Sequence, residues 1–163
     1  MNRSEYLNSV SQFLYQGEVA AEATLNLYVA NEPDPMRRYK WATLLQLETE
    51  TKARLRPFLT RLGLSIVQDD FREQAAKVAQ SYGAKSWTRH MEETAKLTDF
   101  YLAKFREVDE AAPAGDREVT HSMVLHEAAI NRFAKLELEG DSANSLNDVI
   151  AQLKYPLAKP ATA

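Results

Sequence analysis

Three glutamates interrupt the apolar faces of three predicted long helices, and each lies near the middle of its helix. They are Glu18, Glu48 and Glu127. Burying a carboxylate without a partner costs several kcal/mol, which is comparable with the net stability of a domain. Such groups can be ligands of a shared cation, carboxyls that share protons, or partners of a buried basic side chain. For the last of these roles, the candidate basic partner is Lys52, which follows Glu48 by one helical turn.

The alternative is that each glutamate sits at the edge of its apolar face and reaches water. Perturbed carboxylates mark functional sites only as a statistical tendency. The three histidines are interpreted first as ordinary helix residues, and His126 is the best candidate ligand among them because it is adjacent to Glu127. The chain has no cysteine, which excludes disulfides, thiolate metal sites and cysteine nucleophiles.

The elements that must position these side chains are helices, because the apolar periodicity is helical nearly throughout. The predicted long helices span residues 4–30, 35–62, 86–111 and the stretch from Asp116 to Gly140. Shorter helices are predicted within residues 64–85 and over residues 145–154, and a frayed tail over residues 157–163.

Local signals set the expected ends of these helices. Asp34 is a predicted N-cap and Pro35 suits a first helical position, where its missing N–H is harmless. Gly63 and Gly140 are predicted left-handed stops. The sequence Ser65-Ile-Val-Gln68 predicts a capping box for the short helix that follows, and Asp116 is expected to cap the last long helix.

The lengths of the connections predict the topology. Only a few residues join the first two long helices, and the last two are joined equally tightly, so each pair should form an antiparallel hairpin. About twenty residues, 64–85, separate the hairpins and should cross the length of the bundle. A bundle of four long helices with one long crossover is the ferritin-like arrangement. We therefore predict a single all-α domain over residues 1–163, a ferritin-like four-helix bundle with a short C-terminal helix.

Three short stretches also resemble a family. The sequence Gly17-Glu18-Val-Ala-Ala21 resembles the first ligand helix of rubrerythrin-like members of the ferritin-like superfamily. Leu45-Gln-Leu-Glu48 resembles the start of their second-helix Glu-x-x-His motif, and the stretch from His126 to Gly140 resembles their last core helix. The order of the helices is similar over most of the chain, whereas the similarity of individual residues is limited to these three stretches.

The resemblance implies a dinuclear metal centre in which two helices each supply a glutamate and two each supply Glu-x-x-His. By position, the carboxylate ligands would be Glu18, Glu48 and Glu127, and Glu93 is the candidate from the third long helix although it flanks the apolar face. The candidate metal-site residues are thus Glu18, Glu48, Glu127, His126 and Glu93.

The chain departs from the family at both histidine positions. Thr51 stands three residues after Glu48, and Ile130 stands three residues after Glu127. The remaining carboxylates would suit magnesium, calcium or manganese better than redox-tuned iron, so we expect no tightly held di-iron centre. The expected cofactor is an unidentified divalent metal, with iron or manganese as candidates.

The composition fits an ordinary globular domain of 163 residues, with 45% apolar and 26% charged residues and a net charge of −3. It shows no basic patch for nucleic acid and no apolar stretch long enough for a membrane. We expect a cytoplasmic homo-oligomer, in the simplest case a dimer. The leading function is metal binding or oxidoreduction at an altered carboxylate site, and the alternative is a non-catalytic bundle that serves dimerisation or partner binding.

Overall fold

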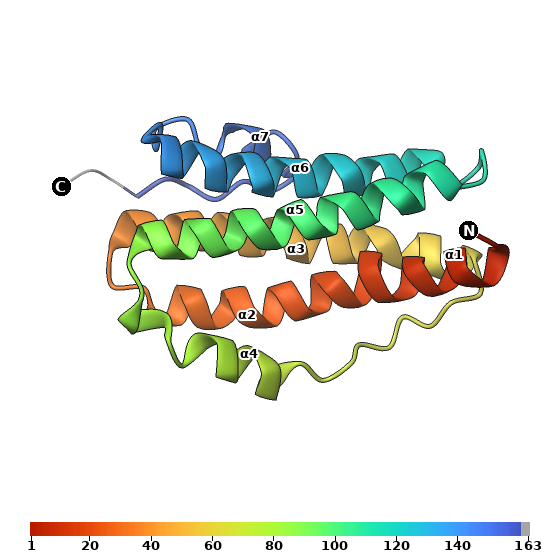
Figure 1. Ribbon diagram of the computed structural model, residues 1–163, viewed down its shortest axis with the longest axis horizontal. Helices are drawn as coiled ribbons and strands as arrows, with labels where there is room; N and C mark the ends of the chain where they lie inside the picture. Colours follow the sequence, from red (N-terminus) through yellow and green to blue (C-terminus); the bar gives the residue numbers. More distant parts are fainter. Residues whose placement is uncertain (161–163) are drawn as a thin grey trace.

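The computed structural model describes residues 1–160, and within this range the chain forms helices without any strand (Figure 1). The long elements are α1 (Arg3–Ser9), a π-helical segment (Val10–Gln16) and α2 (Gly17–Asn31), which follow one another directly, and α3 (Pro35–Arg61), α5 (Trp87–Ala111) and α6 (Arg117–Glu139). The short ones are α4 (Arg72–Ala79), a 3-10 turn (Tyr82–Ala84) and α7 (Asn147–Ile150).

The long helices form two antiparallel hairpins. The α1–α2 rod pairs with α3, and α5 pairs with α6 (Figure 1). The connection between α3 and α5 runs back along the α1–α2 rod and carries α4, which packs on α2. As a result α3 and α5 run in the same direction. This agrees with the topology predicted from the connection lengths.

Several helix ends follow the local signals. The Asp34 side chain accepts a hydrogen bond from the Arg37 backbone N–H at 2.8 Å, with Pro35 in the first helical turn. Gly140 ends α6 with a positive φ of 85°, a conformation that favours glycine. The prediction that the Asp116 side chain caps α6 is wrong. That carboxylate accepts a hydrogen bond from the Tyr6 hydroxyl and pairs with Arg61 instead.

The predicted capping box at the start of the crossing segment is also wrong. The helix begins only at Arg72, and Val67, within the predicted capping box, is 72% exposed. Tertiary contacts hold this stretch in an extended form. The Tyr15 hydroxyl donates to the Ile66 carbonyl at 2.8 Å, and the Gln16 amide donates to the Val67 carbonyl at 2.9 Å. The C-terminal helix is shorter than predicted, and residues 161–163 of the predicted frayed tail lie outside the described residues.

The two residues that hold the crossing segment belong to the π-helical segment, which the apolar pattern did not predict. A π-helix has a wider turn than an α-helix and shifts the faces of the residues that follow. Here Leu14, Tyr15 and Gln16 are all buried in succession. The segment ends at Gln16, two residues before Glu18.

The core consists of two apolar clusters separated by a polar layer. One cluster includes Trp41, Leu44, Leu47, Met91, Ile130 and Phe133, and the other includes Val10, Leu14, Leu55, Phe105, Val108 and Met123. Along α3 and α6, the residues between them are the buried Glu48, Thr51, His126 and Glu127. The polar layer therefore crosses the middle of the bundle. No helix in the described part of the chain is both long and apolar enough to span a membrane.

Candidate metal centre

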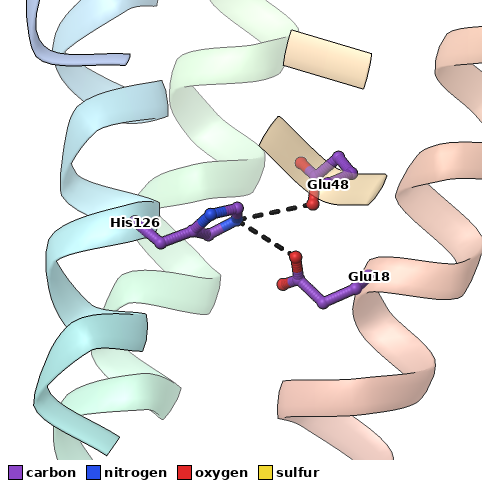
Figure 2. Close-up of side chains that lie close together, drawn as sticks. All are labelled: Glu18, Glu48 and His126. Atoms are coloured by element: carbon purple, nitrogen blue, oxygen red, sulfur yellow. Dashed lines mark ion pairs between the residues drawn. The ribbon is translucent and has the colours of Figure 1, made fainter. Parts of the chain in front are cut away.

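Three buried side chains from three helices meet in this polar layer (Figure 2). Glu18 comes from the first turn of α2, Glu48 from the middle of α3 and His126 from α6. His126 Nε2 lies 3.2 Å from Glu18 Oε2 and 3.4 Å from Glu48 Oε2. The three atoms lie within 4.8 Å of one another, which is compact enough for a single metal ion to contact all of them.

The local sequence explains why the side chains of Glu48 and His126 point into the core. Glu48 is adjacent to the buried Leu47 and lies seven residues before the buried Leu55. His126 lies three residues after Met123 and seven before Phe133, both fully buried. These spacings place the two residues on the core faces of their helices.

The ring of His126 is held from its other side. The Thr51 hydroxyl lies 3.2 Å from His126 Nδ1 and forms a hydrogen bond whose direction depends on the tautomer. When Nδ1–H is the donor, Nε2 carries a free lone pair that faces the two carboxylates. A hydrogen bond at one ring nitrogen is the usual way to orient a histidine that binds metal through the other.

The three facing atoms are close but poorly aligned. Among the described residues, Glu18 Oε2, Glu48 Oε2 and His126 Nε2 are buried side-chain atoms without a hydrogen bond of acceptable geometry. Buried polar atoms are nearly always hydrogen-bonded, so a group of three that converge on one point needs an explanation. A cation between them would satisfy all three at once.

The pKa values of the three buried glutamates are shifted in different directions. Burial raises the pKa of Glu18 well above its usual value, and the charges of Glu48 and Glu127 raise it further. Burial also acts to raise the pKa of Glu48, but the adjacent His126 outweighs this and lowers it. The pKa of Glu127 is raised by burial and by Glu48. Thus in the absence of metal Glu48 favours the ionised form, and Glu18 and Glu127 favour the protonated form.

The remaining predicted ligands lie outside the three-atom cluster. Glu127 is buried next to His126 and lines the same cavity as Glu18 and Glu48. Glu93 on α5 is half-buried at the edge of that cavity, where it pairs with Lys85 at 2.7 Å and Arg89 at 3.1 Å. The structure therefore brings two of the predicted carboxylates to His126 and leaves Glu93 neutralised by basic side chains.

The predicted pairing of Lys52 with Glu48 is wrong. Lys52 is buried, but its ammonium pairs with Glu22, which also accepts a hydrogen bond from Thr49 at 2.7 Å. Glu22, one turn after Glu18 in α2, is thus occupied by Lys52 and Thr49. The base that faces Glu48 is His126, from a helix remote in sequence.

The other two histidines have structural roles. His90 is buried and contacts the Tyr82 carbonyl at 3.1 Å through Nε2, and its ring stacks on Tyr82. His121 is exposed and pairs with Asp109 at 3.2 Å. Only His126 among them reaches the carboxylates, as its position beside Glu127 suggested.

A cavity of about 430 Å³ leads to the cluster. Its two long walls come from α2 and α5, its base includes Glu48 of α3 with Glu127 and Ile130 of α6, and α4 lies at its rim through Gln74 and Val78. Small side chains on α2, including Ala20 and Ala21, leave the space between the two helices unfilled. The cavity gives a small molecule a route to Glu18 and Glu48.

The donor set favours a different metal class from that expected from the sequence. Carboxylates alone suit magnesium, calcium or manganese, whereas an imidazole nitrogen favours metals such as iron, nickel, copper and zinc. The signal for His126 in the sequence was its spacing from Met123 and Phe133, which places it on the buried face. That Glu18 would lie opposite it could not be derived from spacing within one helix.

Known proteins offer no independent guide to the function. Comparisons of the chain with models of protein families, with curated proteins and with solved structures find no match. The chemistry of the three converging side chains is therefore the basis for assigning a function, and it describes an all-helical protein with a buried Glu-Glu-His cluster that can hold a metal ion.

Proposed function

We propose that this protein binds one divalent transition-metal ion through Glu18, Glu48 and His126. The observation that carries the proposal is the convergence of three buried atoms without proper hydrogen bonds, one from each residue. Two carboxylates and a neutral imidazole balance the charge of a divalent ion. Without an ion, burial and the charge of Glu48 shift the neighbouring Glu18 toward its protonated form.

The residues around the ligands fit this assignment. Thr51 orients the His126 ring, and the apolar clusters on both sides exclude bulk water from the layer. Glu127, with its raised pKa, can hold a proton beside the site. A bound divalent ion would supply Lewis acidity or, if it is redox-active, electron transfer.

We further propose that the fold is a variant of the ferritin-like bundle and that the activity is oxidoreduction. The supporting features are the two antiparallel hairpins, the long connection between them and glutamates near mid-helix at the expected places. The replacement of both motif histidines by Thr51 and Ile130 supports one metal ion per chain in place of a di-iron pair.

Metal analysis tests the proposal directly. The protein is purified, stripped with a chelator and titrated calorimetrically with Zn²⁺, Mn²⁺ and, without oxygen, Fe²⁺. We expect one ion per chain and at least about tenfold weaker binding in Glu48→Gln and His126→Gln. His121→Gln, which alters an exposed histidine, is the matched control and should bind as the wild type does. Absence of binding for all three ions would refute the metal centre, and two irons per chain would refute the single-ion assignment.

A second candidate function is association with a partner, in the simplest case a second copy of the chain. The observation that favours it is the exposure of large apolar side chains on α5, where Leu97 is 57% exposed and Phe100 is 52% exposed. Light scattering coupled to size-exclusion chromatography tests it. A dimer that Phe100→Ser converts to a monomer would support association, and a wild-type monomer at all accessible concentrations would contradict it.

A further inference from the structure

The cavity beside the cluster has a distinctive wall. Apolar and aromatic side chains dominate it, including Leu25, Leu44, Phe105 and Ile130 with the rings of Tyr28 and Tyr101. Its volume of about 430 Å³ lies within the range of sites for small organic molecules. Such a cavity in the middle of a bundle forgoes the close packing that stabilises a core, so its retention points to an occupant.

Polar groups also line the wall, and some of them already have partners. The Thr24 hydroxyl donates to the Ala20 carbonyl, and the Thr98 hydroxyl donates to the Thr94 carbonyl, so both threonines satisfy their polar atoms within their own helices. The phenol groups of Tyr28 and Tyr101 form no hydrogen bond with any described residue. They are available to a ligand with one or two polar atoms.

The charges of the wall disfavour an anion. No lysine or arginine lines the cavity, whereas Glu18, Glu48, Glu93 and Glu127 do. Lys85 and Arg89 neutralise Glu93 at the rim. A divalent ion on Glu18 and Glu48 would offset the two carboxylates at the inner end. The cavity of the metal-loaded protein therefore has little net charge and an apolar body.

We propose that this cavity binds an uncharged, mainly apolar organic molecule whose single polar end lies at the Glu18, Glu48 and His126 cluster. This assignment rests on the proposed metal centre and names the class of ligand that the centre would act on. The molecule enters between α2 and α5 past Val78 of α4, its apolar body packs between the two helices, and its polar group reaches the inner end.

A matched series of naphthyl compounds tests the ligand class. Naphthylmethanol, naphthoate and naphthylmethylammonium share one ring system and differ in charge. Each is titrated into zinc-loaded protein, and binding is followed by calorimetry and by quenching of tryptophan fluorescence, since Trp41 lines the cavity. We expect naphthylmethanol to bind about tenfold or more tightly than the two ions. Equal or tighter binding of either ion would overturn the assignment of an uncharged ligand.

Filling the cavity tests the location. Ala21→Phe places a ring in the space from the α2 wall and should weaken naphthylmethanol binding by about tenfold or more. Ala30→Phe, the same substitution at an exposed position of α2, is the control and should change nothing. If Ala21→Phe does not fold, Thr94→Leu fills the cavity from the α5 wall. Unchanged affinity in a folded filled variant would overturn the location.

The zinc titration distinguishes a failure of the proposed ligand class from a failure of the proposed metal centre. If zinc binds and naphthylmethanol does not, the ligand inference fails and the metal centre stands. If zinc does not bind, the metal centre fails, and with it the placement of the ligand's polar end at a metal.

Discussion

Among the clusters of buried charged side chains in the described residues, two differ clearly in how completely their atoms are paired. In the first, Lys40 of α3 pairs with Glu137 of α6, with side chains 5% and 3% exposed. The Lys40 ammonium also donates to the Ser142 carbonyl at 3.0 Å, and Glu137 accepts from the Trp87 indole at 2.8 Å and from Ser145 at 2.5 Å. The second is the cluster of Glu18, Glu48 and His126, whose facing atoms form no proper hydrogen bonds.

The difference separates a structural ion pair from a ligand site. A complete set of partners fixes the geometry of Lys40 and Glu137 and leaves no capacity for a further ligand. The pKa of Glu137 is correspondingly lowered, because Lys40 and hydrogen bonds from Ser145 and Trp87 outweigh the effect of burial. At the second cluster, burial dominates for Glu18 and raises its pKa. Incomplete pairing marks the second cluster as the functional one.

The largest effect is expected where the complete pair is broken. Lys40→Met should lower the free energy of unfolding by about 3–5 kcal/mol, because the Glu137 carboxylate is left buried without its cation. Urea unfolding of the variant and the wild type measures the change. Lys77→Met removes a lysine from the exposed pair with Glu73 and should change stability by less than about 0.5 kcal/mol. Equal effects of the two substitutions would contradict the interpretation of Lys40 and Glu137 as a structural pair.

The incomplete cluster should behave in the opposite way. Glu48→Gln should be tolerated in the presence of a chelator, because it removes a negative charge beside Glu18 and Glu127 at nearly constant shape, and Lys52, which pairs with Glu22, loses no partner. With free zinc at a hundredfold excess over the wild-type Kd, the wild type should gain about 2.7 kcal/mol, and the variant, which binds at least about tenfold more weakly, should lose about half of that gain or more. Thermal melts with and without zinc measure both effects. Destabilisation of several kcal/mol by Glu48→Gln without metal would show that the cluster is a structural ion pair like the first.

The dependence of stability on pH sharpens the comparison further. Glu127 has a raised pKa in the folded protein, so above its ordinary value of 4.5 the unfolded chain loses this proton first. The contribution of Glu127 to stability therefore falls as pH rises, by at most about 1.4 kcal/mol per pH unit. Glu127→Gln should accordingly gain stability relative to the wild type, up to about 2 kcal/mol, between about pH 5 and about pH 7 with chelator present.

A control separates this effect from the titration of other acids. Glu110→Gln, at an exposed position of α5, should show no trend with pH relative to the wild type. If the difference in stability between Glu127→Gln and the wild type stays constant over this pH range, Glu127 is ionised in the folded protein.

The smallest expected effect concerns the orientation of His126. Thr51→Val removes the hydroxyl 3.2 Å from Nδ1 at nearly constant shape and should weaken zinc binding by up to about tenfold, or about 1.4 kcal/mol. Thr60→Val is the control, since the Thr60 hydroxyl bonds only to carbonyls of its own helix. Calorimetric titration measures both. An affinity equal to that of the wild type would show that packing alone holds the imidazole.

Much of the helical framework could be predicted from the sequence because its signals are local. Asp34 with Pro35 marked the start of α3, and Gly140 marked the end of α6, since caps and left-handed stops act within a few residues. Connection lengths indicated the pairing of helices. The same approach failed at Ser65, where contacts from Tyr15 and Gln16 to distant carbonyls hold the chain extended.

The candidate site could likewise be predicted only in part from the sequence. The sequence by itself placed Glu18, Glu48 and Glu127 within the apolar faces of their predicted helices, because helical periodicity fixes which side of a helix a residue occupies, but it left open whether their side chains reach water. It could not distinguish Glu127 from Glu137 of the same helix, which also has a buried side chain but is paired with Lys40. Only the tertiary structure decided that His126 meets Glu18 and Glu48 and that Lys52 turns to Glu22. The pairing of a buried charge depends on the relative rotation and depth of separate helices, which packing across the whole core sets.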